Sequence, residues 1–361
     1  MYEFSKADAD HLLEWYRKNK RDLPWRDTGD LYDVWLSEIM LQQTRVEAVK
    51  DHFIRFKKVL PDIGSLANVD DDDLMRLWEG LGYYSRARYL KQCAIRLIEE
   101  YDGVFPMDQR KLLKLPGIGP YTAGAILAIG YGFPYAAVDG NVLRVMTRCF
   151  GIRDDIRASY VSDQITGLIN DFYHKNPVDR QYVRDLTQAL MELGAMVCVP
   201  NGKPICETCP FYKDCVCREL KAYARIPYRS ALKDRKITEK TVFVISDHEK
   251  FLLHKRPSRG LLAGMYEFLN TDGYLDQDEA VAYLRDLGFD VLRISRIDDA
   301  RHIFTHREWH MKGYEVFVGE WKEVPEGCLV ADREELKKLA IPSAFKVYTE
   351  RYMLRESEEE E

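Results

Sequence analysis

Residues 115–125 read Leu-Pro-Gly-Ile-Gly-Pro-Tyr-Thr-Ala-Gly-Ala, and this stretch decides the fold of the first half of the chain. A short helical segment, Lys111–Leu115, leads into a turn that contains Gly117 and Gly119, and a helix rich in small residues follows. The two glycines let a DNA phosphate approach the backbone, and the first turn of the second helix presents unpaired N–H groups. The pattern predicts a helix–hairpin–helix that binds DNA without reading its sequence, although an ordinary tight turn between helices would look similar.

Length, charge and hydropathy limit the classes of protein to be considered. The chain has 361 residues, which is too long for one typical core and predicts two domains, with three as the alternative. The net charge of -6 argues against coating nucleic acid by bulk charge, but it allows a local basic groove. No apolar run approaches the ~18 residues of a membrane span, and residues 1–6 lack the pattern of a signal peptide. We therefore expect a cytoplasmic protein with no membrane partner.

The expected secondary structure changes from helices to a mixture of strands and helices after a cluster of cysteines. Apolar residues recur at three- and four-residue spacing through residues 5–200, which predicts helices. We expect an all-α domain at residues 1–218, a charged linker at 219–238, an α+β domain at 239–352 and an acidic tail at 353–361. The expected elements of the second domain are strands at Thr241–Ser246, Phe251–Lys255, Val291–Ile297 and Gly313–Val318, and a helix at about Asp276–Leu287.

Five of the eight cysteines lie close together near the end of the helical region. Four of them, Cys198, Cys206, Cys209 and Cys215, have the short gaps that let thiolates surround a [4Fe–4S] cluster or a tetrahedral zinc ion. The segment has only one Cys-x2-Cys pair, whereas a zinc ribbon has two, so iron–sulfur is favoured. Cys217 is then a bystander rather than a ligand.

Two carboxylates, Glu38 and Asp139, form a candidate catalytic pair. Glu38 lies among apolar residues on a predicted helix, where burial should raise its pKa and let it donate a proton near neutral pH. Asp139 precedes a helix that starts at about Asn141. One acid for the leaving group and one ionised stabiliser of a sugar cation are what cleavage of a glycosidic bond requires. The alternatives are a plain surface glutamate and a simple helix N-cap.

A loop with two glycines, Trp78–Arg88, carries aromatic residues at its tip and arginines at the start of the next helix. Such a loop could insert Tyr83 into a base stack while arginines such as Arg86 hold phosphate. Packing of the aromatic rings in the core is the alternative.

Together these motifs resemble the helix–hairpin–helix DNA glycosylase superfamily and, within it, the adenine DNA glycosylases of the MutY type. The resemblance extends from about Trp15 to about Tyr348 and rests on the hairpin, the Asp139 loop, the cysteines and the appended α+β domain. One departure is the first cysteine gap, which has seven residues here and six in the family. Gly202 and the prolines beside it make the extra residue easy to absorb in a loop.

The resemblance implies a role for each matching residue. Glu38 would be the general acid, Asp139 would stabilise the oxocarbenium ion, and Tyr121 and Asn141 would shape the site. The remaining implied residues are Trp25, Arg26 and Gln188 in the adenine pocket, Gln43, Leu81 and Tyr83 at the emptied base stack, and Cys198, Cys206, Cys209 and Cys215 on a [4Fe–4S] cluster.

The second domain resembles the MutT-like, or Nudix, module of these glycosylases. Its implied role is to recognise 8-oxoguanine through Phe304, Thr305 and His306. Nucleotide hydrolysis is not expected, because Ala282 and Arg285 stand where the Nudix helix has metal-binding glutamates. The histidines around this loop could bind zinc instead, but no cysteine flanks them.

The activity implied by the resemblance is hydrolysis of the N-glycosidic bond of adenine mispaired with 8-oxoguanine or guanine, after base flipping. The substrate would be double-stranded DNA at the nucleoid, and the product an abasic site. A rival enzyme of the endonuclease III type carries a lysine after the hairpin, where this chain has Tyr121, which cannot form a Schiff base. A non-catalytic mismatch sensor and a nucleotide hydrolase are further alternatives. A monomer is expected, because nothing marks an oligomer interface.

Overall fold

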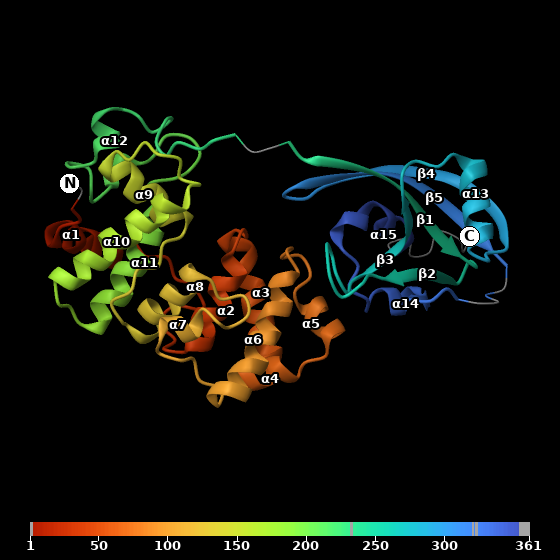
Figure 1. Ribbon diagram of the computed structural model, residues 1–361, viewed down its shortest axis with the longest axis horizontal. Coiled ribbons are helices and arrows are strands. Elements are labelled where there is room, and N and C mark those ends of the chain that lie inside the picture. The colour runs from red at the N-terminus through yellow and green to blue at the C-terminus, as the bar shows by residue number, and fades with distance from the viewer. Residues whose placement is uncertain (1–2, 232–233, 320, 322–323, 354–361) are drawn as a thin grey trace, which may run out of the picture. The chain divides into compact units, whose positions relative to one another are not determined.

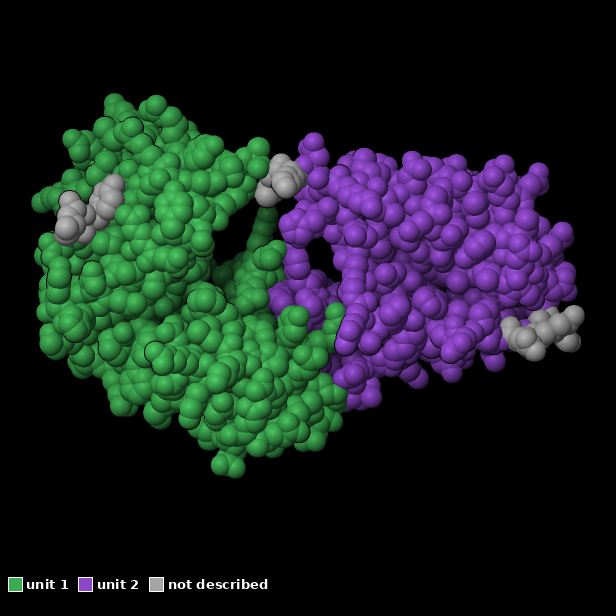
Figure 2. Space-filling model, in the orientation of Figure 1, with its two compact units in different colours: residues 1–69, 88–231 green, residues 70–87, 232–361 purple. Residues whose placement is uncertain are grey.

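The computed structural model describes residues 3–231, 234–319, 321 and 324–353. The chain forms two compact units, one of residues 1–69 and 88–231 and the other of residues 70–87 and 232–361 (Figure 2). The first unit is helical and the second is built on a sheet (Figure 1). Within the described ranges, no helix is both long and apolar enough to cross a bilayer.

Helices make up the first two-thirds of the chain, and two of them reach into the second unit. Helix α5 and the first residues of α6 group with the sheet, and the others belong to the helical unit. The bounds are α1 (Lys6–Asn19), α2 (Leu31–Leu41), α3 (Val46–Val59), α4 (Ile63–Asn68), α5 (Asp71–Leu77), α6 (Ser85–Tyr101), α7 (Gln109–Leu112), α8 (Pro120–Ala125), the π-helix η1 (Ile126–Tyr131), α9 (Gly140–Phe150), α10 (Ser159–Lys175), α11 (Arg180–Met196), the 3-10 turn η2 (Cys206–Thr208) and α12 (Val216–Glu219).

Local capping starts the helices, and one apolar core joins them. The Ser5 side chain accepts a hydrogen bond from the backbone of Asp8 at the start of α1, and Asp179 caps α11 in the same way. Such caps satisfy backbone N–H groups that a helix leaves unpaired. Helices α1, α9, α10 and α11 then bury their apolar faces against one another, through residues such as Leu12, Val145, Phe172 and Leu190.

The predicted hairpin lies between α7 and α8. Gly117 has a φ of +74°, and a Cβ added there would lie 2.7 Å from the Cβ of Tyr89, so only glycine fits this turn. Gly119 precedes α8 and Pro120 occupies its first turn, where the missing N–H costs nothing. The first hairpin helix ends at Leu112, three residues earlier than predicted, and the turn is correspondingly longer.

The second unit contains a mixed six-stranded sheet with the strand order β4-β5-β1-β3-β2-β6. The two longest pairings, β1 with β5 in parallel and β4 with β5 antiparallel, form one side of it. The elements are β1 (Lys236–Ser246), β2 (Lys250–Lys255), β3 (Tyr266–Asp272), α13 (Gln277–Asp286), β4 (Val291–Ile303), β5 (Arg307–Val318), β6 (Cys328–Asp332), α14 (Arg333–Leu336), the 3-10 turn η3 (Ser343–Phe345) and α15 (Lys346–Met353).

Alternation along β1 gives the sheet two buried faces. Val242 and Val244 face a cluster that includes Phe345 and Tyr348, next to α15. The intervening residues, such as Phe243, face a second cluster that includes Leu284 of α13. Because successive strand residues point to opposite faces, this pattern places helices on both sides of the sheet (Figure 1).

The segment between the units is more ordered than the linker expected at residues 219–238. Ala222 and Ile226 pack on Cys217 in a small apolar cluster, so the helical unit continues beyond α12. At the other end, β1 already begins at Lys236 because it pairs with Arg307 of β5. Residues 232–233, and residues 354–361 of the expected acidic tail, lie outside the described residues.

Candidate active site

A cavity of about 690 Å³ opens in the helical unit and gathers residues from distant parts of the chain. It is formed by α2, the hairpin with α8, the start of α9, one face of α11 and the segment before α2. Of the residues predicted to act in catalysis or DNA binding, those that line this cavity are Trp25, Arg26, Glu38, Gln43, Gly117, Gly119, Tyr121, Asp139, Asn141 and Gln188.

Glu38 is buried on α2, with 8% of its surface exposed. Desolvation raises its pKa to about 7, and the charge of Asp139 adds to this effect. The Tyr121 hydroxyl donates a hydrogen bond to the Glu38 carboxylate, and together with Arg26 it opposes the rise without cancelling it. Burial also raises the pKa of Tyr121 far above its usual range, so this phenol stays protonated. Glu38 can therefore hold a proton near neutral pH and release it.

Asp139 is the N-cap of α9 and at the same time a wall of the cavity. One of its oxygens accepts the backbone N–H groups of Asn141 at 2.9 Å and Val142 at 2.8 Å, and the other accepts Nδ2 of Asn141 at 2.7 Å. Burial raises the Asp139 pKa, but these three donors oppose that rise. Asp139 can therefore act both as a helix N-cap and as a catalytic carboxylate, because the capping hydrogen bonds fix the position of its carboxylate.

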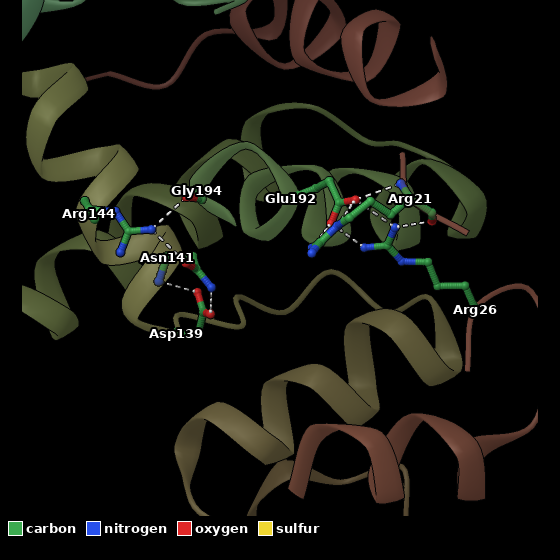
Figure 3. A network of polar contacts seen from close by, with 7 residues as sticks. All are labelled: Arg21, Arg26, Asp139, Asn141, Arg144, Glu192 and Gly194. Atoms are coloured by element: carbon green, nitrogen blue, oxygen red, sulfur yellow. Dashed lines mark hydrogen bonds and ion pairs between the residues drawn. The ribbon is translucent and has the colours of Figure 1, made fainter. Parts of the chain in front are cut away.

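A chain of hydrogen bonds runs from Asp139 toward the cysteine loop (Figure 3). Asn141 Oδ1 accepts a hydrogen bond from Nη2 of Arg144 at 2.8 Å. The same Nη2 atom also donates a hydrogen bond to the carbonyl of Gly194. Nε of Arg144 donates to the carbonyl of Cys198 at 2.7 Å. Arg144 therefore links the loop of Cys198 to the residue that orients Asp139, a function that the sequence did not suggest.

A second network of three charged residues lies at the same cavity (Figure 3). The buried carboxylate of Glu192 accepts from Nε and Nη2 of Arg21 at 2.9 and 2.7 Å, and from Nη2 of Arg26 at 2.7 Å. Burial alone would raise the Glu192 pKa, but the arginine hydrogen bonds outweigh it and hold the pKa at about 2. Arg21 and Glu192 were missed by sequence reasoning, although Glu192 lies one helical turn after Gln188 on the same face of α11.

We expect Glu192→Gln to lower the free energy of unfolding at pH 7 by about 3 kcal/mol, because it leaves two guanidinium groups without a buried counter-charge. Since the folded pKa of Glu192 is depressed to about 2, the stabilisation is present above its ordinary pKa and is lost as the pH falls toward 2. Urea unfolding of both proteins at pH 7 and pH 3 measures this. The matched control is Asp185→Asn, which removes an ion pair of α11 with the exposed Arg17 and should cost under about 1 kcal/mol. Equal losses for both variants would contradict the assignment.

The predicted DNA-contacting loop and the predicted recognition loop both belong to the second unit. The side chain of Tyr83 is half exposed, and its hydroxyl lies 2.8 Å from Oγ1 of Thr305. Thr305 and His306 are exposed in the turn between β4 and β5. Phe304 instead packs edge-on against Trp309, with ring centroids 4.9 Å apart, and so anchors that turn.

Two residues of the predicted DNA-contacting set are buried. Arg86 donates to the carbonyls of Leu81 at 2.9 Å and Gly82 at 3.0 Å, and its guanidinium lies over the ring of Trp78. It holds the loop in shape in this structure rather than presenting its charge to a phosphate. Leu81 is also buried, so its insertion into DNA would require the loop to move.

The four cysteines predicted as ligands line one small cavity, together with Cys217 and the buried Arg148. Nη1 of Arg148 lies 3.4 Å from the sulfur of Cys198 and donates to the carbonyl of Val199 at 2.9 Å. Within the described residues, no group of three or more His, Cys, Asp or Glu side chains is arranged to hold a metal ion.

Comparison with known proteins places these features in a family. Residues 36–170 match the family described as HhH-GPD superfamily base excision DNA repair protein, and residues 241–351 match the NUDIX domain. The adenine DNA glycosylase of Buchnera aphidicola subsp. Acyrthosiphon pisum is 33% identical over 304 residues, which cover 83% of each chain. The human adenine DNA glycosylase is 32% identical over 398 residues, covering 93% of this chain and 72% of its own.

The chain belongs to the adenine DNA glycosylase family. It is therefore a DNA N-glycosylase of base excision repair, with a helix–hairpin–helix unit and a Nudix-like sheet unit. Among solved structures, that of a thermostable thymine-DNA glycosylase is 29% identical, with a TM-score of 0.53 over 60% of this chain and 98% of its own.

Proposed function

We propose that this glycosylase removes adenine mispaired with 8-oxoguanine or guanine, after flipping the adenine out of the duplex. The observation that carries the proposal is the pairing of Glu38 and Asp139 in one cavity, an acid with a pKa of about 7 beside a carboxylate held by three donors. Acid-assisted glycosidic cleavage needs one carboxyl group that gives a proton and a second that faces the sugar cation, and the three hydrogen bonds to Asp139 favour its charged form. The cavity of about 690 Å³ has room for a purine base and for the water molecule that attacks the sugar.

The reaction follows from these positions. Glu38 donates its proton to N7 of adenine, and the electron pair of the bond between C1′ and N9 leaves with the base. The Asp139 carboxylate stabilises the oxocarbenium ion, and water then adds to C1′ and gives a proton to the Glu38 carboxylate, which leaves an abasic site and restores the acid. Trp25, Arg26 and Gln188, which line the same cavity, would hold the base.

The enzyme should be monofunctional, without strand-cleaving activity of its own. Tyr121 follows the hairpin at the position where a strand-cleaving relative carries an amine, and a phenol cannot form a Schiff base with the sugar. Its hydroxyl is also engaged with the Glu38 carboxylate. The hairpin of Gly117 and Gly119 would bind the phosphate backbone, and Gln43, Leu81 and Tyr83 would occupy the stack that the adenine leaves. We expect the enzyme to act as a monomer in the cytoplasm, at the nucleoid.

We also propose that Cys198, Cys206, Cys209 and Cys215 hold a [4Fe–4S] cluster. The donor set fits, because four thiols line one cavity and the guanidinium of Arg148 beside them would stabilise negative sulfur. When bound, the cluster would cross-link the loop from which the Cys198 carbonyl accepts Arg144.

The decisive experiment is a single-turnover assay on a duplex with one 8-oxoguanine:adenine pair, labelled on the adenine strand. Cleavage of that strand only after alkali would support the proposal. A thymine-glycol duplex runs alongside, and its cleavage without alkali, with none of the first duplex, would indicate an endonuclease III-like enzyme. Tight binding of both duplexes without any turnover would indicate a mismatch sensor.

Recognition of 8-oxoguanine is assigned to the β4–β5 turn. We expect Thr305→Ala combined with His306→Ala to reduce the preference for 8-oxoguanine:adenine over guanine:adenine by tenfold or more, which corresponds to about 1–3 kcal/mol of lost hydrogen bonding. Both side chains are exposed, so the fold should survive. Single-turnover rates on the two duplexes give the ratio. His248→Ala, in the β1–β2 turn of the same sheet, is the control, and an unchanged ratio in the double variant would refute the assignment.

A further inference from the structure

The cavity proposed for the cluster is lined by five cysteines, whereas a [4Fe–4S] cluster takes four. The fifth is Cys217, which the sequence pattern suggested to be a bystander. In the structure its side chain is buried, with 2% exposed, and it lines the same cavity as the four predicted ligands.

The short helix α12 holds Cys215 and Cys217 at this cavity together. Cys215 is the N-cap of α12, and its thiol donates a hydrogen bond to the carbonyl of Arg148 at 3.5 Å. Val216, between the two cysteines, packs directly on the end of α9, where a Cβ added to Gly151 would lie only 2.5 Å from Cγ1 of Val216. This contact fixes the first turn of α12, so both thiols stay at the cavity wall.

A buried positive charge lies at the cavity that Cys217 lines. Arg148 lines the same cavity and donates to Cys198 Sγ at 3.4 Å, so a buried positive charge is available to any sulfur there. Cys149 differs, because it is not among the residues that line the cavity, although it packs against the same helical core as Cys198, Cys209 and Cys215. A cysteine can therefore lie close to the four predicted ligands without lining their cavity.

We propose that Cys217 is a reserve ligand, able to bind the iron that Cys215 otherwise holds. The inference rests on the cluster proposed above. In the exchange the Cys217 thiol would give its proton to solvent and its sulfur would form one Fe–S bond, while the Fe–S bond of Cys215 breaks and the released Cys215 thiolate takes up a proton from solvent. No electron is transferred, so the exchange needs no oxidant or reductant.

The test measures iron and sulfide content and the absorbance near ~400 nm that thiolate-bound iron gives. The purified full-length proteins are the wild type, Cys215→Ala, Cys217→Ala, the double variant Cys215→Ala with Cys217→Ala, and Cys149→Ala as the matched control. Alanine is used because a serine hydroxyl could itself bind iron. We expect about four irons per chain in the wild type and in each single variant, with a shifted spectrum for Cys215→Ala. The double variant should lose at least one iron.

The outcomes separate the two proposals. A wild type without iron would overturn both the cluster and the reserve ligand. An iron-loaded wild type whose Cys215→Ala variant loses as much iron as the double variant would overturn only the reserve ligand. If Cys215→Ala does not accumulate as folded protein, iron release to a chelator from the wild type and from Cys217→Ala decides instead. We expect at least twofold faster release from Cys217→Ala and no change for Cys149→Ala, and equal rates in all three proteins would refute the proposal.

Discussion

Asp139→Asn should reduce single-turnover adenine release by about a thousandfold while leaving DNA binding intact. A carboxylate about 4 Å from a sugar cation contributes roughly 4 kcal/mol at an effective dielectric constant near 20, and each 1.36 kcal/mol is tenfold in rate. The amide has the same shape but carries no charge. The measurement is the rate of base release on an 8-oxoguanine:adenine duplex at saturating enzyme, with the binding constant measured separately.

The same substitution should cost little stability, which separates a catalytic role from a structural one. Asparagine caps helices about as well as aspartate, so the hydrogen bonds from the N–H groups of Asn141 and Val142 can remain. Only the bond from Asn141 Nδ2 is lost, since that amide cannot turn over while its oxygen accepts from Arg144. This should cost about 1 kcal/mol.

Asp179→Asn, at the N-cap of α11 and outside the cavity, makes the same change where no cation forms. It should leave the rate of base release unchanged. If Asp139→Asn releases adenine at nearly the wild-type rate, Asp139 has no catalytic role. If the variant unfolds, capping of α9 is the main role of Asp139.

The features that the sequence predicted are those decided over a few neighbouring residues. The hairpin depends on Gly117, Gly119 and Pro120, whose backbone preferences act locally, and it lies where the pattern placed it. Asp139 begins α9 for the same kind of reason. The cysteine spacing likewise brought four thiols to one cavity without any knowledge of the fold.

The features that were missed depend on side-chain contacts that a local sequence pattern does not show. Glu192 is bound by an arginine 171 residues earlier, and nothing in the pattern of α11 indicates that pairing. Strand β3 was not among the expected strands, and its charged residue, Glu267, is buried against Arg256 and His254 of neighbouring segments. Arg86 was assigned to DNA from its charge; in this structure its guanidinium donates to carbonyls of its own loop, and its contact with DNA stays a prediction.

Glu38→Gln should be the second large loss, roughly a thousandfold in base release, since a positioned general acid contributes about 10²–10⁴-fold. The amide can still accept the Tyr121 hydroxyl, so the site should keep its shape, but it has no proton to give. The pH profile identifies the acid. Because the pKa of Glu38 is raised to about 7 and the protonated form is the active one, the wild-type rate should be flat below pH 7 and fall about tenfold per unit above it. Glu38→Gln should lack this step, and Glu14→Gln, exposed on α1, should keep it.

The same substitution should make the protein more stable, which a merely structural glutamate would not do. Ionising Glu38 is harder in the fold than in the unfolded chain, so its contribution favours folding below its ordinary pKa of 4.5 and is lost as the pH rises through about 7. At pH 8 the neutral amide avoids that penalty, and the free energy of unfolding should rise by up to about 3 kcal/mol. Urea unfolding at pH 5 and pH 8 should show the gain mainly at pH 8. A variant destabilised at both values would mean that the Glu38 carboxylate supports the fold, and its loss of activity would then say nothing about proton donation.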